Sequence, residues 1–136
     1  MIYLLDTNAW VAYLRQSHAG LIARLQRESP DDVVLCSVVL GELCYGAVRS
    51  GPTREAANFA LITHLRQQFA SLPFDYDAAE EYGRLRADLT KRGMIIGPND
   101  LMIAAIALAN DVKLVTHNTA EFSRVPGLTI EDWQNA

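Results

Sequence analysis

Residues 1–10 read MIYLLDTNAW, and the apolar run at residues 2–5 passes directly into the carboxylate of Asp6. A short, uninterrupted apolar run is typical of a strand that is covered on both faces, as in a parallel sheet. A carboxylate that directly follows such a strand lies beside the hydrophobic core, where charge is costly unless it is paired or hydrogen-bonded. The stretch therefore predicts a buried strand that delivers Asp6 to a functional site. The alternative is that Asp6 only caps the next helix, which stabilises a helix by about 1 kcal/mol.

Similar apolar runs predict the remaining strands. The clearest are residues 33–36 and 113–116, and the weaker candidates are residues 72–74 and 128–130. Helical spacing occupies the segments between them, at residues 8–14, 18–28, 38–48, 53–70, 78–92 and 100–109. Strands that alternate with helices predict an α/β fold with a central, mostly parallel sheet flanked by helices. Ligands of such sheets bind outside the carboxyl ends of the strands.

Several helices carry start signals in the sequence. Ser37 precedes an apolar helical segment, Pro52 and Thr53 precede another, and Asp77 with Glu80 three residues later has the pattern of a capping box. We expect these residues to mark the first turns of their helices.

Length and composition indicate one compact unit. The chain has 136 residues, half of them hydrophobic, and shows no repeat or long linker, so we expect a single domain over residues 1–136. No signal peptide pattern and no apolar run of membrane-spanning length is visible, which predicts a cytoplasmic protein without membrane contact. Cys36 and Cys44 lack the paired spacing of a zinc site and are expected to be reduced thiols.

The charge balance argues at first sight against a nucleic-acid partner. The net charge is −4, although ten of the twelve basic side chains are arginine, which binds phosphate well. Four basic residues lie close together at Arg84, Arg86, Lys91 and Arg92. They fit a phosphate-binding surface or simply the solvated face of a helix.

A second acid, Glu42, lies in the helical stretch SVVLGELCYGA at residues 37–47. At 100° per residue it shares a face with Val38 and Tyr45, so it does not lie on a plainly solvated side. The same helix contains Gly41 and Gly46, although glycine weakens a helix by about 1 kcal/mol relative to alanine. Either tight helix packing or the approach of a ligand or another backbone would explain them.

A third acid, Asp100, stands at the start of the most apolar helix. In IIGPNDLMIAAIALAN, residues 95–110, the Gly-Pro-Asn sequence interrupts the backbone and the nine residues after Asp100 are uncharged. That helix is expected to be buried almost all round, with Asp100 at its buried end. The alternative is that Asp100 only offsets the helix dipole, worth about 0.3–1 kcal/mol.

The fourth region is LVTHNTAEF at residues 114–122. Here a strand ends at Thr116 and the polar residues His117, Asn118 and Glu121 follow, with no aspartate in the place that corresponds to Asp6.

Carboxylates that converge in a partly dry site need a proton or a cation to relieve their repulsion. Because no cysteine or histidine lies at ligand spacing, that cation would be hard and oxygen-loving, which favours Mg²⁺ or Mn²⁺. Such a cation would also allow a phosphate group to bind beside the acids, although the net negative charge of the chain argues against it.

The sequence resembles the PIN-domain ribonucleases, and within them the VapC-type toxins of bacterial toxin–antitoxin pairs. The stretches that carry the resemblance are LLDTN (4–8), SVVLGELCYGA (37–47), LPFDYDAAEEYGRLRADL (72–89), IGPNDLMIAAIALA (96–109) and LVTHNTAEFSRVPGLTIEDW (114–133). The resemblance implies a PIN fold and an endoribonuclease that depends on Mg²⁺ or Mn²⁺. It also implies a cognate VapB-type antitoxin, a homodimer, and contact with DNA only through the antitoxin.

The resemblance also assigns site residues. It implies Asp6 and Asp100 as metal ligands and Glu42 as the third catalytic acid. It places Thr7 and Asn8 in the polar shell that fixes Asp6, and Thr116 and Asn118 at the strand end that contributes to the same pocket. Many PIN nucleases have aspartate where this chain has Asn118, which weakens the case for a second metal.

We expect hydrolysis of an RNA phosphodiester, with transfer RNA as one substrate, by a metal-activated water, so that translation and growth stop. Two alternatives remain. One is a catalytically silent RNA-binding module with the same fold. The other is a phosphohydrolase with Asp6 as nucleophile, although Asn8 stands where such enzymes have a second aspartate.

Overall fold

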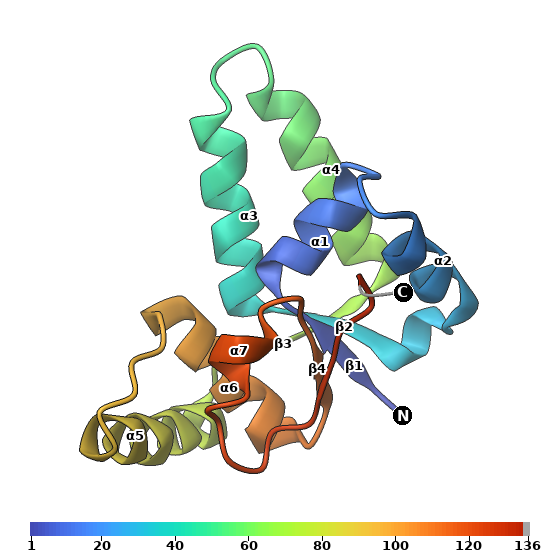
Figure 1. Cartoon of the computed structure of the whole chain (residues 1–136). Helices are drawn as coiled ribbons and strands as arrows, with labels where there is room; N and C mark the ends of the chain where they lie inside the picture. Colours follow the sequence, from blue (N-terminus) through green and yellow to red (C-terminus); the bar gives the residue numbers. More distant parts are fainter. Residues whose placement is uncertain (135–136) are drawn as a thin grey trace.

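The structure is a computed structural model that describes residues 1–134. Its centre, which Figure 1 shows between the helices, is a five-stranded sheet. Every pairing in the sheet is parallel, and the strand order is β3-β2-β1-β4-β5. The strands are β1 (Tyr3–Leu5), β2 (Val33–Cys36), β3 (Ala70–Leu72), β4 (Lys113–Val115) and β5 (Ile130–Glu131). This arrangement confirms the α/β fold with a central parallel sheet flanked by helices.

The middle strand β1 sets the position of the first acid. Leu4 pairs with Val34 of β2 on one side and with Leu114 of β4 on the other. All three residues of β1 are buried. Because the strands are parallel, their carboxyl ends lie at one edge of the sheet, and Asp6 follows β1 at the middle of that edge.

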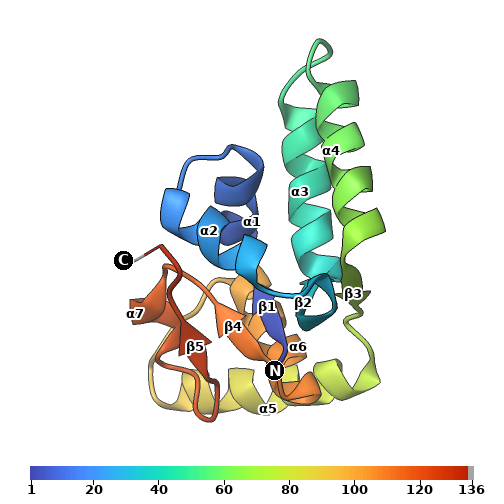
Figure 2. The same cartoon turned by 90° about the vertical axis from the view of Figure 1, so that its right-hand side faces the viewer.

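Helices cover both faces of the sheet. They are α1 (Thr7–Leu14), α2 (Ala19–Arg27), α3 (Ser37–Arg49), α4 (Glu55–Gln68), α5 (Tyr76–Lys91), α6 (Pro98–Asn110) and α7 (Thr119–Phe122), with a 3₁₀ turn η1 at Pro30–Asp32. Figure 2 shows α1 and α2 on one side of the sheet and α5 and α6 on the other. The paired helices α3 and α4 extend beyond the sheet as a hairpin (Figures 1 and 2).

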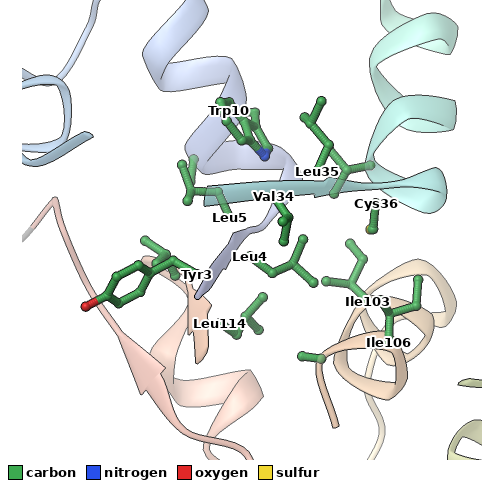
Figure 3. Close-up of a cluster of buried hydrophobic side chains, with 14 of the residues drawn as sticks. Tyr3, Leu4, Leu5, Trp10, Val34, Leu35, Cys36, Ile103, Ile106 and Leu114 are labelled. Carbon is green, nitrogen blue, oxygen red and sulfur yellow. The ribbon is translucent and has the colours of Figure 1, made fainter. Parts of the chain in front are cut away.

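The core lies on both faces of the short strands. Leu35 of β2 lies toward Trp10 of α1, whereas Leu4 of β1 lies toward Ile103 and Ile106 of α6 (Figure 3). All five side chains are fully buried. The predicted burial of the uncharged helix after Asp100 is confirmed, because most residues of α6 after its first turn are inaccessible to solvent.

Two edge strands begin at different residues from those predicted. The strand predicted at residues 72–74 lies at Ala70–Leu72, and the one predicted at residues 128–130 lies at Ile130–Glu131. Both are at the edges of the sheet and contain only two or three residues. Their positions are set by pairing with β2 and β4, which an apolar run of this length cannot specify.

Two helix caps also differ from the prediction. The cap of α5 is Asp75, whose carboxylate accepts a hydrogen bond from the backbone N–H of Ala78 at 3.0 Å, and Asp77 lies within the first turn. Ser37 does not cap α3, because its hydroxyl oxygen accepts from the N–H of Phe74, 3.0 Å away. Ser37 thus links α3 to the segment after β3.

Both cysteines are free thiols, as expected. Burial raises the pKa of Cys36 to about 11, so this thiol stays protonated and unreactive at neutral pH. Within residues 1–134, no helix is long and apolar enough to cross a membrane.

Candidate active site

Acidic side chains from four elements gather at the carboxyl edge of the sheet. We call the set Asp6, Glu42, Asp100 and Glu121 the acidic cluster. Asp6 follows β1, Glu42 lies in α3, Asp100 lies in the first turn of α6, and Glu121 lies in α7. The structure therefore brings together the three acids that the sequence predicted, and it adds a fourth.

Asp6 is the most rigidly held acid. The residue is 4% exposed, and Oδ1 of its carboxylate accepts a hydrogen bond from the N–H of Ala9 at 2.9 Å. Its Oδ2 accepts from the hydroxyl of Thr116 at 2.6 Å. Burial raises the pKa of Asp6, the two hydrogen bonds oppose this rise, and the negative charge of Glu42 adds to it. Asp6 is therefore the N-cap of α1, and it also contacts Thr116, the residue that follows β4.

Glu42 is half-buried and is held from two other helices. The hydroxyl of Thr7, the first residue of α1, donates to Oε1. The side-chain amide of Asn99, in the first turn of α6, donates to Oε2 at 3.3 Å. These contacts fix the third acid relative to the helices that start beside Asp6 and Asp100.

Asp100 shows how crowded the negative charge is. Burial, followed by the negative charges of Glu121, Asp6 and Glu42 in that order of size, raises its pKa from 3.8 to about 7. The carboxyl of Asp100 therefore keeps its proton to a much higher pH than an ordinary aspartate when no cation is bound. A carboxyl group with this pKa needs a proton or a cation to offset its neighbours.

Glu121 is the acid that the sequence analysis did not assign to the site. Its Oε1 accepts from the N–H of Gly97 at 2.8 Å, and its Oε2 accepts from the side-chain amide of Asn118. Its negative charge also raises the pKa of the nearby Asp100 carboxyl. The sequence did contain one indication that Glu121 belongs to the site. Glu121 lies three residues after Asn118, on the short helix that follows a buried strand.

Thr116 and Asn118 both lie at the end of β4, where the resemblance placed them. Thr116 is 1% exposed, and its hydroxyl accepts from the N–H of Asn118 at 3.0 Å while it donates to Asp6. The side chain of Asn118 donates to Glu121. Asn118 therefore positions the carboxylate of Glu121. Many PIN nucleases have an aspartate at the position that Asn118 occupies.

The polar shell of Asp6 differs from the one expected. Thr7 contacts Glu42, and Asn8 is exposed without a side-chain hydrogen bond to the described part of the chain. The contacts to Asp6 come instead from Ala9 and Thr116. The reason is local geometry: once Asp6 caps α1, Thr7 and Asn8 are the first helical residues and point away from their neighbour's carboxylate.

The donors of the acidic cluster suit a hard cation. Within residues 1–134, no group of three or more His, Cys, Asp or Glu side chains is arranged so that it could hold a metal ion. Mg²⁺ and Mn²⁺ do not require one, since such ions keep several waters and bind one or two carboxylates together with substrate phosphate. The oxygen-only donors and the crowded charge on Asp100 therefore fit a hard divalent cation.

The chain is similar to a known protein family along nearly its whole length. The PIN domain family matches residues 3–128. The ribonuclease VapC2 of Rickettsia felis is 34% identical over 134 residues, which covers 98% of each chain. The tRNA(fMet)-specific endonuclease VapC of Shigella flexneri is 37% identical over 132 residues, which covers 96% of this chain and 97% of the other.

Solved structures give the same result for the fold. The VapBC2 complex of Rickettsia felis, bound to a promoter DNA fragment, contains a chain with a TM-score of 0.89 and 33% identity, covering 98% of this chain and 99% of that one. DNA-bound VapBC from Salmonella typhimurium has a TM-score of 0.89 and 32% identity, with 98% of each chain covered. This chain therefore belongs to the PIN-domain family and, within it, to the VapC-type ribonuclease toxins.

Proposed function

We propose that this protein is a divalent-metal-dependent endoribonuclease whose acidic cluster cleaves RNA. PIN-domain ribonucleases generally depend on a divalent metal ion. The observation that carries the proposal is the convergence of four acids from four elements, where burial and the neighbouring negative charges raise the pKa of Asp100 to about 7. A site of this kind is poised to bind a cation together with the phosphate that the cation neutralises.

Asp6 and Asp100 would hold Mg²⁺ or Mn²⁺, with Glu42 as the third catalytic acid. When bound, the ion supplies a water of lowered pKa and neutralises charge on the phosphate oxygens. Asp6 keeps its orientation through Thr116 and the N–H of Ala9. We assign to Glu42, fixed by Thr7 and Asn99, the orientation of the attacking water and the acceptance of its proton.

The expected reaction is hydrolysis that leaves a 5′-phosphate and a 3′-hydroxyl. Attack by the ribose 2′-hydroxyl usually relies on histidine, and the acidic cluster contains none. Transfer RNA is the substrate we propose first, because two relatives are named tRNA(fMet)-specific endonucleases. Cleavage of such an RNA would stop translation and growth, and it would take place in the cytoplasm.

The proposed protein partner is an antitoxin of the VapB type. The similar chains of Rickettsia felis and Salmonella typhimurium were each solved as VapBC bound to DNA. We expect this chain to form a homodimer and to reach promoter DNA only through its antitoxin.

The test is cleavage of purified transfer RNA by the purified chain. We expect cleavage with Mg²⁺ or Mn²⁺ and none with EDTA, and sequencing of the fragments should show 5′-phosphate ends. Asp6→Asn and Asp100→Asn should each abolish cleavage while circular dichroism stays unchanged. Asp31→Asn, which alters an exposed acid in η1, is the matched control and should cleave normally.

Three results would contradict the proposal. The first is cleavage at the normal rate by either site variant, and the second is a fragment that ends in a 2′,3′-cyclic phosphate. The third is RNA binding without cleavage in any divalent metal, which would identify the chain as a silent RNA-binding module.

A further inference from the structure

A hollow lies directly beside the acidic cluster, on the side of α3. Its volume is about 510 Å³, within the usual ~300–1,000 Å³ of small-molecule sites. It is lined by Val38, Gly41, Tyr45, Asn99 and Met102, and it shares Thr7 and Glu42 with the acidic cluster and its contacts. We call it the α3 hollow. A group bound there would lie within reach of a phosphate held at the acidic cluster.

Gly41 borders open space in the α3 hollow. A Cβ atom added at Gly41 would meet nothing within 4 Å, and the same is true of Gly46. Tight packing within the described chain therefore does not explain these glycines, and the approach of a ligand or of another backbone remains for Gly41. A helix of this length would be more stable with alanine at that position.

Tyr45 and Asn99, which line the hollow, and Arg49, which lies beside Tyr45, have the chemistry that binds single-stranded RNA. Tyr45 lies one turn after Glu42 and is 66% exposed, so its ring is free for stacking. The guanidinium carbon of Arg49 lies 6.0 Å from the centre of that ring, where it adds positive charge. The amide of Asn99 uses one hydrogen on Glu42 and has a second donor and a carbonyl oxygen for a base edge. RNA-binding proteins combine the same three elements: aromatic stacking, hydrogen bonds to base edges, and arginine near phosphates.

We propose that the α3 hollow binds the RNA base next to the cleaved phosphate. Tyr45 stacks on the base, Asn99 forms hydrogen bonds with its edge, and Arg49 contacts the adjoining backbone. The proposal rests on the ribonuclease function proposed above and adds to it the residues that select the base beside the cut.

Binding measurements separate this proposal from the cleavage reaction. Every protein carries Asp6→Asn so that no RNA is cut, and fluorescence anisotropy reports the affinity. One probe is a fluorescein-labelled RNA decamer of mixed sequence, and the other is the same backbone with every base removed. We expect the Asp6→Asn protein to bind the intact decamer about tenfold more tightly than the abasic one.

Changes in the α3 hollow should remove this preference. Tyr45→Ala should lower the affinity for the intact decamer to that for the abasic one, and Tyr45→Phe should restore it, because the phenyl ring still stacks. Gly41→Leu should act like Tyr45→Ala by filling the space. Tyr76→Ala and Gly83→Leu are matched controls, since Tyr76 is 79% exposed and a Cβ at Gly83 also meets nothing within 4 Å. Neither residue lines the hollow.

Two outcomes would overturn the proposal. In one, the Tyr45 and Gly41 variants distinguish the two probes as well as their parent does. In the other, Gly41→Leu changes the sedimentation velocity to that of a smaller assembly, which would identify the α3 hollow as an interface between copies of the chain. If either outcome is observed and the unmodified chain still cleaves transfer RNA, the proposed base-binding role of the α3 hollow is contradicted and the proposed ribonuclease function is not. If it cleaves no RNA, the anisotropy data still decide whether a base is bound.

Discussion

Asp6 and Asp100 are both partly or fully buried acids, but their surroundings differ. Asp6 has a hydrogen-bond donor on each oxygen, and those donors stabilise its charged form. Asp100 faces Glu121, which opposes its ionisation. Burial raises the pKa of both carboxyls, and only in Asp6 do hydrogen bonds oppose the rise.

The raised pKa of Asp100 predicts how the metal-free protein responds to pH. Below about pH 4 this carboxyl is protonated in both the folded and the unfolded chain, so it costs no stability. Between 3.8 and about 7 the unfolded chain releases the proton and the folded chain keeps it, so the free energy of unfolding falls as pH rises. Above about pH 7 the carboxyl has released its proton in both the folded and the unfolded chain. The loss of stability caused by burying the charged Asp100 then no longer changes with pH.

Asp100→Asn should therefore raise the free energy of unfolding by roughly 1–3 kcal/mol at pH 8 and leave it nearly unchanged at pH 4. Urea denaturation in EDTA at the two pH values measures this difference. An equal effect at both pH values would show that the charge of Asp100 is not its cause.

Thr116→Val should weaken the site by removing the donor to Asp6. The side-chain volume is nearly unchanged, but the buried Oδ2 atom loses its partner, so we expect a loss of about 1–3 kcal/mol in stability. The affinity for Mn²⁺ should fall about 10–100-fold, as is usual when a residue that orients a metal ligand is changed. Isothermal titration with Mn²⁺ measures this effect, and Thr63→Val on the exposed side of α4 should behave like the original chain.

At the scale of helices and strands, caps are a direct test of the observed boundaries. Asp75→Ala should destabilise the protein by about 1 kcal/mol, because the N–H of Ala78 loses its acceptor. Asp77→Ala removes a charge from the first turn only, worth roughly 0.3–1 kcal/mol. Thermal denaturation compares the two variants, and a larger loss for Asp77→Ala would favour the capping box that the sequence suggested.

The sequence predicted the central strands well because burial on both faces leaves a continuous apolar run, as in Val33–Cys36. It predicted Asp6 and Asp100 as site residues because each directly adjoins such a buried element. It did not specify β3 and β5, whose positions depend on pairing with their neighbours. It also left Glu121 unassigned, since the four-residue helix α7 is too short for a periodic pattern.

The contacts around the acidic cluster join segments that are far apart in the chain. Thr116 lies 110 residues from Asp6, and Asn99 lies 57 residues from Glu42. The cluster can therefore form only when the whole sheet has assembled. Stability of the fold and integrity of the site should be lost together.

Metal binding should consequently stabilise the entire protein. With Mn²⁺ at 100 times its dissociation constant, mass action adds about 2.7 kcal/mol to the free energy of unfolding. We expect Tm to rise by roughly 5–10 °C for a chain of this size. Differential scanning calorimetry with MnCl₂ and with NaCl of equal ionic strength measures the rise, which should vanish in Asp6→Asn. A rise of the same size in NaCl would assign it to general screening of charge.

The double role of Asp6 has a consequence for selection in a growing culture. Asparagine caps helices as well as aspartate does, and the hydroxyl of Thr116 can rotate to accept from the new amide. A transition at the first codon position converts one residue into the other, so a spontaneous mutant can lose toxicity while its product still folds. Such an escape mutant would still bind the antitoxin. Where binding of the antitoxin is itself favourable to the cell, cells that survive toxin overexpression should carry this substitution more often than a truncation of the toxin.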